Sequence, residues 1–327
     1  MKPRKIMGIG NAIVDALQPV EDDFLIRMKI DKGVMQLIDQ DRAESLYWEM
    51  VAPRQSPGGS VANTIAGIGA LGLETAFIGR VRDDELGYFY AQAMEQDGIA
   101  FLNPPAPDGE LPTSRSMIFV SPDGERSMNT YLGISAEFGP EDVPDDIGGK
   151  ADFLFLEGYL YDKPKGKAAF GKAARLIRDG GGKAGIALSD PFCVERHRDS
   201  FRQLVRELDY VIGNEHEWMS LYQCDLETAL EQAARESGMV VCTRSGKDVI
   251  LIHDDRHERI HVNPIVPVDA TGAGDQFAAG FLYGLAAGAP LDIAGRMGCV
   301  AASEVISHFG ARPERDVREL FRQEKLI

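Results

Sequence analysis

Short, almost continuously apolar segments recur along this chain, and stretches with helical periodicity separate most of them. The apolar segments are IMGIGNAIV, ETAFIGRV, DFLFLEG, KAGIALSD, LDYVIGN, GMVVCTR and DVILIH. Continuous apolar character, without alternation, is typical of strands that are covered on both faces, as in a parallel sheet between two helical layers. In one intervening stretch, Val61, Ile65, Ile68 and Leu71 share a helical face and Gly72 stands where a C-terminal cap is expected. The pattern predicts a doubly wound α/β fold.

Two regions interrupt this α/β alternation. TSRSMIFV, the turn SPDGE and RSMNTYLG have the pattern of two strands joined by a short loop, which predicts a hairpin. Residues 16–40 also lack the periodicity of an amphipathic helix. We expect insertions at about 16–40 and 103–134 to form a small β-sheet lid. Because no linker or internal repeat divides the chain, residues 1–327 are predicted to form one domain.

The composition of the chain limits the classes of partner that the protein can bind. Its 327 residues carry a net charge of −16 without a long basic run, which argues against nucleic acid and anionic membranes. The four cysteines are widely spaced and suggest reduced thiols in the cytoplasm. Asn11 and Asp15 interrupt the N-terminal apolar segment too early for a signal peptide. We therefore predict a cytoplasmic monomer or homodimer that acts on a small molecule.

The stretch DATGAGDQFAAGF at residues 269–281 combines a glycine-rich turn with the start of a helix. Gly272, Ala273 and Gly274 would present backbone N–H groups at a helix N-terminus, which is an anion site. Asp275 would lie in the first helical turn, placed to accept a proton from an attacking hydroxyl. The alternative is that Asp275 only complements the helix dipole and the glycines only form the turn.

Two further motifs follow predicted strands. In NEHEW, Asn214 and Glu217 have the spacing of a capping pair, or Glu217 helps to hold a hydrated Mg²⁺ beside phosphates. TRSGKD, which contains Thr243 and Gly246, would form a loop at the C-terminal end of a strand, where open α/β sheets bind ligands. As a turn signal alone, TRSGKD is weak.

Polar groups and glycines near the N-terminus suggest an acceptor site. Asn11 and Asp15 follow the first apolar segment, at the expected ligand end of its strand. In SPGGSVANT, the pair Gly58 and Gly59 precedes a helix whose first turn carries Asn63. This stretch predicts either a hinge and a substrate contact or an ordinary helix start.

Together, DATGAGD, GGSVANTIAGIGALG and NEHE resemble the signature motifs of the ribokinase-like, or PfkB, family of carbohydrate and nucleoside kinases. They occur in the family's order, and the resemblance spans residues 8–310. It implies a ribokinase-like fold and transfer of a phosphoryl group from MgATP to a hydroxymethyl group, in a cleft beneath a β lid. The cofactors implied are therefore ATP and Mg²⁺.

The resemblance also assigns roles to the matching residues. It implies Asp275 as catalytic base, the backbone of Gly272, Ala273 and Gly274 as the anion hole, Asn214, Thr243 and Gly246 on the ATP side, Glu217 for magnesium, and Asn11, Asp15, Gly58, Gly59 and Asn63 on the acceptor side. Asp269 would fix the turn and, in relatives, helps to order a monovalent cation such as K⁺. Ala270 departs from the threonine of many members and weakens the case for that cation.

The motifs do not decide which of two classes of acceptor the enzyme phosphorylates. GNAIVD and ASEVISHFGARP resemble adenosine kinase-like members, which favours a nucleoside such as adenosine. The alternative is a free sugar of the ribose, fructose or 2-keto-3-deoxygluconate type. Phe119, Phe138 and Phe192 would serve as stacking or as core residues and do not decide between them.

Two other functions compete with a kinase. An NAD-binding oxidoreductase is disfavoured because Ile13 stands where the third glycine of a dinucleotide fingerprint belongs. A non-catalytic nucleotide sensor on the same fold would have little need of Asp275 beside the glycine turn.

Overall fold

The computed structural model describes residues 5–107, 111–254, 256–263 and 265–327. A nine-stranded sheet forms the body, in the order β14-β13-β12-β11-β10-β9-β1-β5-β6. Its strands are β1 (Lys5–Ile9), β5 (Glu74–Ile78), β6 (Ile99–Phe101), β9 (Phe153–Glu157), β10 (Lys183–Ala187), β11 (Tyr210–Asn214), β12 (Met239–Arg244), β13 (Lys247–His253) and β14 (Arg256–Ile260). All neighbours from β12 to β6 pair in parallel, so their C-terminal ends share one edge of the sheet. The predicted doubly wound α/β fold is confirmed.

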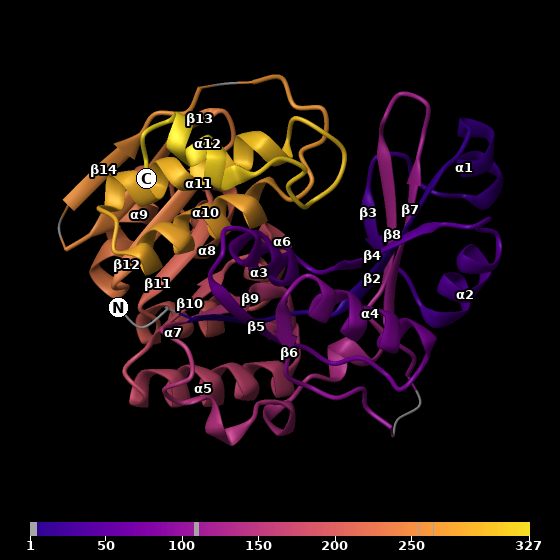
Figure 1. Ribbon diagram of the computed structural model, residues 1–327, viewed down its shortest axis with the longest axis horizontal. Helices are drawn as coiled ribbons and strands as arrows, with labels where there is room; N and C mark the ends of the chain where they lie inside the picture. The colour runs from indigo at the N-terminus through magenta and orange to yellow at the C-terminus, as the bar shows by residue number, and fades with distance from the viewer. Residues whose placement is uncertain (1–4, 108–110, 255, 264) are drawn as a thin grey trace.

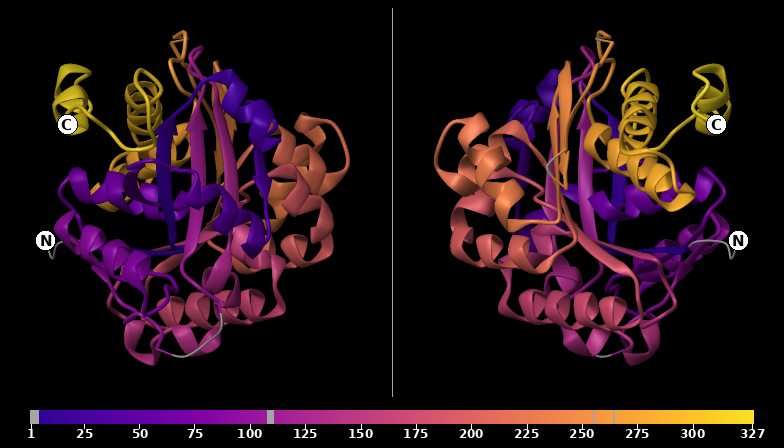
Figure 2. Two further views of the ribbon diagram at one scale, coloured as in Figure 1. Left: turned by 90° about the vertical axis from the view of Figure 1, so that its right-hand side faces the viewer. Right: turned by 90° about the vertical axis from the view of Figure 1, so that its left-hand side faces the viewer.

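Helices cover both faces of this sheet, as the two views in Figure 2 show. One face packs against α5 (Pro164–Asp179), α6 (Pro191–Arg196), α7 (Arg198–Glu207), α8 (Glu215–Tyr222) and α9 (Leu226–Glu236). The other packs against α3 (Ser60–Ala70), α4 (Glu85–Gln96), α10 (Ala273–Ala287) and α11 (Leu291–Val305), and α12 (Val317–Gln323) packs on α10 and α11. This double cover explains the continuous apolar strands, because a strand between two helical layers has no solvated face.

The second sheet lies at one end of the body and forms the lid, defined here as residues 13–58 and 114–131 (Figure 1). Its order is β3-β8-β7-β2-β4, with the strands β2 (Ile13–Pro19), β3 (Met35–Leu37), β4 (Arg54–Gly58), β7 (Ser114–Val120) and β8 (Arg126–Tyr131). The short helices α1 (Asp22–Met28) and α2 (Gln40–Trp48) pack on one face through a small core that includes Phe119. Between the lid and the sheet of the body, the chain passes through the 3-10 turns η1 (Gly133–Glu137), η2 (Pro140–Asp142) and η3 (Asp145–Ile147), and η4 (Gly158–Asp162) follows β9.

Several strands differ from the sequence expectations. IMGIGNAIV, expected as one strand, is divided between β1 of the body and β2 of the lid, and β6 was not among the expected strands. β4 belongs to the lid but lies outside both ranges predicted for it, and its sequence RQSPG carries no strand pattern. β13, expected among the parallel strands, pairs antiparallel with β12 because a two-residue turn joins them and cannot support a parallel crossover. β14 was not predicted, because RHERI is highly charged, a composition that an edge strand tolerates.

Among the described residues, none of the helices has the combination of length and apolar character needed to span a bilayer.

Candidate active site

Asp275 lies in the first turn of α10, as predicted, and faces the N-terminus of α3. Its carboxylate accepts hydrogen bonds from the Ser60 hydroxyl at 2.6 Å and from the Asn63 amide nitrogen at 3.2 Å. Burial raises the pKa of Asp275 to about 6, although these two hydrogen bonds act in the opposite direction. A carboxylate with this pKa is ionised at neutral pH and still basic enough to accept a proton during a reaction. Ser60 had not been singled out in the sequence.

The glycine turn before α10 is bent as an anion site requires. Gly272 caps the helix with a φ of 78°, and a Cβ there would stand 2.7 Å from the Cα atom of Ala311. The amide of Ala273 donates to the carbonyl of Ala270 at 3.3 Å. For the amides of Gly272 and Gly274, the described part of the chain provides no hydrogen-bond acceptor. The first amides of a helix lack partners in the helix itself, so these two can bind an external anion.

Asp269 links this turn to the lid. Its carboxylate accepts hydrogen bonds from the amides of Thr271 at 2.9 Å and Gly310 at 3.0 Å, and Arg126 of β8 forms an ion pair with it at 2.7 Å. Burial opposes ionisation of Asp269, but these donors outweigh it and lower its pKa. The carboxylate therefore fixes the turn, as the resemblance implied. A monovalent cation beside it stays a prediction.

Asp15 approaches the same place from the lid. It lies in β2 opposite Ser56, and an added Cβ on the neighbouring Gly58 would be 2.4 Å from its carboxylate oxygen. Burial raises the pKa of Asp15 to about 6; the positive charges of Arg126 and Arg312 lower it, and the negative charge of Asp275 raises it. Asp15 and Asp275 are therefore close enough to interact, one on the lid and one on the body.

Asn11 is held within the protein at both ends of its amide. Its nitrogen donates to Glu157 at 2.6 Å, and its oxygen accepts from the Ser135 hydroxyl at 2.8 Å. Its backbone oxygen would stand 2.1 Å from a Cβ added to Gly59, whose φ is 106°. Only glycine fits at position 59 for both reasons. Asn11 thus braces the start of α3.

Glu157 is a buried acid at this site that the sequence reasoning missed. It ends β9, is only 1% exposed, and accepts a hydrogen bond from the Val61 amide at 3.1 Å as well as the one from Asn11. Burial raises its pKa to about 7, against the effect of these hydrogen bonds. The available signal was a glutamate at the end of the apolar segment FLFLE, because such a residue is seldom buried without a partner.

Asn214 and Glu217 form a capping box at the start of α8. The Glu217 carboxylate accepts from the Asn214 backbone amide at 2.7 Å and from its side-chain nitrogen at 2.6 Å. Glu217 is 4% exposed, and burial raises its pKa to about 7, assisted by the charge of Asp190 and opposed by the Asn214 amide. The capping alternative is therefore what the structure contains. It leaves a buried carboxyl whose ionised form a nearby cation would stabilise.

Thr243 lies directly beside Asn214, because the two are register partners at the ends of β12 and β11. Gly246 lies in the exposed turn between β12 and β13. Tyr159 lies in η4, after β9, and its hydroxyl donates to the Ser189 carbonyl at 3.4 Å. Burial raises its pKa, and so do the charges of the acids on both sides, which are Asp190, Glu157, Glu217 and Asp275.

Of the three phenylalanines considered for stacking, Phe119 and Phe138 are core residues, and Phe192 is 72% exposed at the start of α6.

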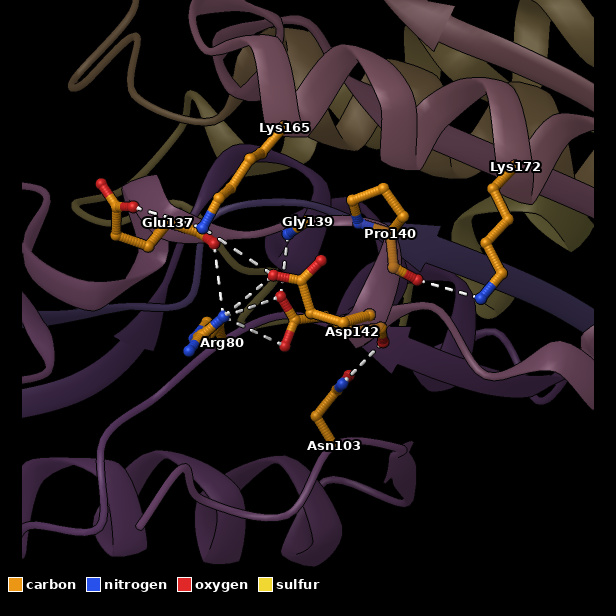
Figure 3. Close-up of polar contacts among 9 residues, drawn as sticks. Arg80, Asn103, Glu137, Gly139, Pro140, Asp142, Lys165 and Lys172 are labelled. Atoms are coloured by element: carbon orange, nitrogen blue, oxygen red, sulfur yellow. Dashed lines mark hydrogen bonds and ion pairs between the residues drawn. The ribbon is translucent and has the colours of Figure 1, made fainter. Parts of the chain in front are cut away.

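Arg80 and Lys172 hold the segment from η1 to η2 by polar contacts (Figure 3). Arg80 donates to the Glu137 carbonyl at 3.3 Å and pairs with Asp142 at 3.1 Å, while Lys172 donates to the carbonyls of Pro140 and Val143. These contacts fix the chain where it returns from β8 to the body. Ser135, which bonds to Asn11, lies in η1 at the start of this segment.

Comparisons with known proteins agree with this arrangement. Residues 28–317 match the model of the pfkB family of carbohydrate kinases. The "probable sugar kinase protein" of Rhizobium etli is 41% identical, covers 100% of both chains and superposes with a TM-score of 0.90. The adenosine kinase of Sinorhizobium meliloti is 41% identical, covers 98% of this chain and 99% of its own, and has a TM-score of 0.88. The 5-dehydro-2-deoxygluconokinase of Geobacillus thermodenitrificans is 29% identical and covers 81% of this chain and 84% of its own.

The family match spans most of the chain and includes the glycine turn, the capping box and the lid strands β3, β4, β7 and β8. The chain therefore belongs to the pfkB family of carbohydrate kinases, and it is a sugar or nucleoside kinase.

Proposed function

We propose that the protein is an ATP- and Mg²⁺-dependent nucleoside kinase that phosphorylates a hydroxymethyl group of adenosine or a similar nucleoside. The observation that carries the choice of a nucleoside is the inner face of the lid.

Directly paired residues in a sheet share a face. One row across the lid is Met35, Met128, Ile118, Leu17 and Arg54, and the next row is Leu37, Thr130, Ser116, Asp15 and Ser56. The bond between the Ser116 and Thr130 hydroxyls, 2.8 Å, agrees with this alignment. Asp15 therefore lies beside an apolar row on the face opposite α1 and α2. A carboxylate suits the hydroxyls of a ribose, and the apolar row suits a flat, largely apolar base.

The chemistry follows from the position of Asp275. As the acceptor hydroxyl attacks the γ-phosphorus of ATP, its proton passes to the Asp275 carboxylate, the new O–P bond forms, and the bond to the ADP oxygen breaks. Ser60 and Asn63 orient the carboxylate through the hydrogen bonds described above. The amides of Gly272 and Gly274 would stabilise negative charge on the transferred phosphoryl group.

Kinases of this family generally use ATP with Mg²⁺, and the residues present are suited to it. Glu217, with Asp190 nearby, would hold the ion through water, and Asn214, Thr243 and Gly246 would line the nucleotide side. The buried carboxyl of Glu217, whose raised pKa disfavours its charged form, is a group that a divalent cation would stabilise. When bound, the ion neutralises charge on the phosphates.

The Sinorhizobium adenosine kinase supports the nucleoside, because it resembles this chain over nearly the whole length of both. A free sugar acid is the second candidate. Arg54 ends the apolar row of the lid and would suit a carboxylate, and a 5-dehydro-2-deoxygluconokinase is among the relatives.

A coupled ADP-release assay with adenosine, ribose, fructose and 2-keto-3-deoxygluconate tests the proposal. We expect adenosine to give the highest kcat/KM by at least about tenfold, which corresponds to about 1.4 kcal/mol. A sugar acid that exceeds adenosine would replace the nucleoside by the second candidate. Binding of ATP without turnover of any acceptor would favour the nucleotide sensor.

A further inference from the structure

We infer that Arg312 is a positioning residue that couples the nucleotide side of the site to the lid hinge at Gly58 and Gly59. This inference rests on the proposed kinase function but not on the identity of the acceptor. Arg312 lies in the loop after α11, within the stretch ASEVISHFGARP, and the sequence analysis assigned it no role.

The guanidinium of Arg312 joins three separate elements. It donates to the carbonyl of Pro57 in β4 at 2.8 Å and to the side-chain oxygen of Asn63 in α3 at 3.4 Å, and it forms an ion pair with Asp97 at the end of α4. Pro57 immediately precedes Gly58, so the first contact holds the lid strand at the point where it enters the body. The side chain is 24% exposed, which limits competition from water.

Arg312 also sets the orientation of Asn63. A guanidinium can only donate hydrogen bonds, so the amide oxygen of Asn63 must face it. The amide nitrogen then faces Asp275 and donates to its carboxylate at 3.2 Å. Arg312 therefore acts on the proposed base through Asn63.

The backbone beside Arg312 packs on the glycine turn. The carbonyl of Ala311 accepts a hydrogen bond from Gln276 of α10 at 3.0 Å, and its Cα atom closely approaches Gly272. The amide of Gly310 bonds to Asp269. An anion that settles in the turn will fix this loop, and the loop in turn fixes the hinge through Arg312. The contacts thus form a continuous connection between the two binding sites.

Such a connection predicts that the two substrates bind cooperatively, because each would order the same loop and hinge. The affinity for the acceptor is measured by calorimetry with and without a non-hydrolysable ATP analogue and Mg²⁺. In the wild type we expect the analogue to raise acceptor affinity by at least about fivefold, the low end of typical coupling. In Arg312→Met we expect this factor to fall close to one.

Steady-state kinetics gives a second readout. We expect Arg312→Met to lower kcat/KM for the acceptor by at least about tenfold, the scale of a lost hydrogen bond to a charged group, with the KM for ATP changed less than about threefold. Arg312→Lys keeps the charge but not the forked geometry, so it should restore part of the coupling. Arg315→Met is the matched control, because it removes an exposed charge three residues away.

The inference is overturned if wild type shows no coupling, or if folded Arg312→Met matches Arg315→Met within about twofold in both readouts, less than one lost hydrogen bond would cause. If Arg312→Met does not fold, Arg312→Lys decides: coupling equal to wild type overturns the inference. The acceptor used is whichever compound the wild-type enzyme phosphorylates. Failure of the proposed nucleoside is therefore seen in the acceptor assay of the wild type, whereas failure of the coupling is seen in wild-type calorimetry or in the variants.

Discussion

Replacing Asp275 with asparagine should lower the activity of the enzyme while its stability stays equal or increases. Asparagine keeps the size of the side chain and can accept the hydrogen bond from Ser60, but it cannot take the proton of the acceptor hydroxyl. We expect kcat to fall by at least about 10²-fold, or about 2.7 kcal/mol in the activation barrier. The KM for ATP should change much less, because the anion turn uses backbone amides.

The stability of the same variant follows from the pKa of Asp275. Burial raises that pKa from 3.8 to about 6, so the ionised carboxylate opposes folding at neutral pH by up to about 3 kcal/mol. The protonated carboxyl does not carry this penalty. Its stabilising contribution is therefore complete below about pH 4 and is lost as the pH rises through 6. Asp275→Asn lacks this loss. Above pH 6 we therefore expect its free energy of unfolding to equal or exceed that of the wild type. The weaker hydrogen bond from Asn63 will offset part of this gain.

Chemical denaturation at pH 5 and pH 7.5, with kinetics on the same samples, provides the measurement. Asp225→Asn is the matched control: Asp225 caps α9 at the surface, where asparagine caps equally well, so turnover and stability should both be nearly normal. A folded Asp275→Asn enzyme that keeps more than about a tenth of wild-type turnover would refute the role of general base. A large loss of stability would refute the electrostatic argument.

Three further changes test other parts of the site. Gly59→Ala would place a Cβ 2.1 Å from the Asn11 carbonyl at a φ of 106°, so thermal denaturation should show a loss of at least about 2 kcal/mol, and an unchanged Tm would contradict the close approach. Glu217→Gln should raise the Mg²⁺ concentration for half-maximal activity by at least about tenfold while the helix cap persists, and an unaltered magnesium titration would exclude this carboxylate. Asp15→Asn should raise the KM for the acceptor by about tenfold or more and leave that for ATP nearly constant; a selective effect on ATP would place Asp15 on the wrong side of the site.

The sequence predicted the parts of the fold that depend on local pattern. The apolar strands, the β7–β8 hairpin and the helix starting beside Asp275 each follow from residues close together in the chain. β4 was not predicted, because its sequence has no strand pattern and its pairing with the distant β2 makes it a strand.

The candidate site shows the same division. The roles of Asp275 and Glu217 follow from short motifs. Ser60 and Arg312 also lie in quoted stretches, but their roles, like that of Glu157, depend on partners that the fold brings from distant positions. Arg126 likewise has no motif of its own, and only the approach of β8 to Asp269 reveals it. To predict such residues, one must know which loops meet in the fold, and a single sequence does not give this information.

The lid is assembled from two separate excursions of the chain, and this has a consequence for the order of folding. Its central pairing joins β2 to β7, strands that are far apart in sequence and that the body must first bring together. The β7–β8 hairpin can form locally, but β2 and β4 can join it only after β1, β5 and β9 have set the distance between the two excursions. We therefore expect the lid to complete late in folding, so that a newly made chain gains the lid side of its site only after the body has formed.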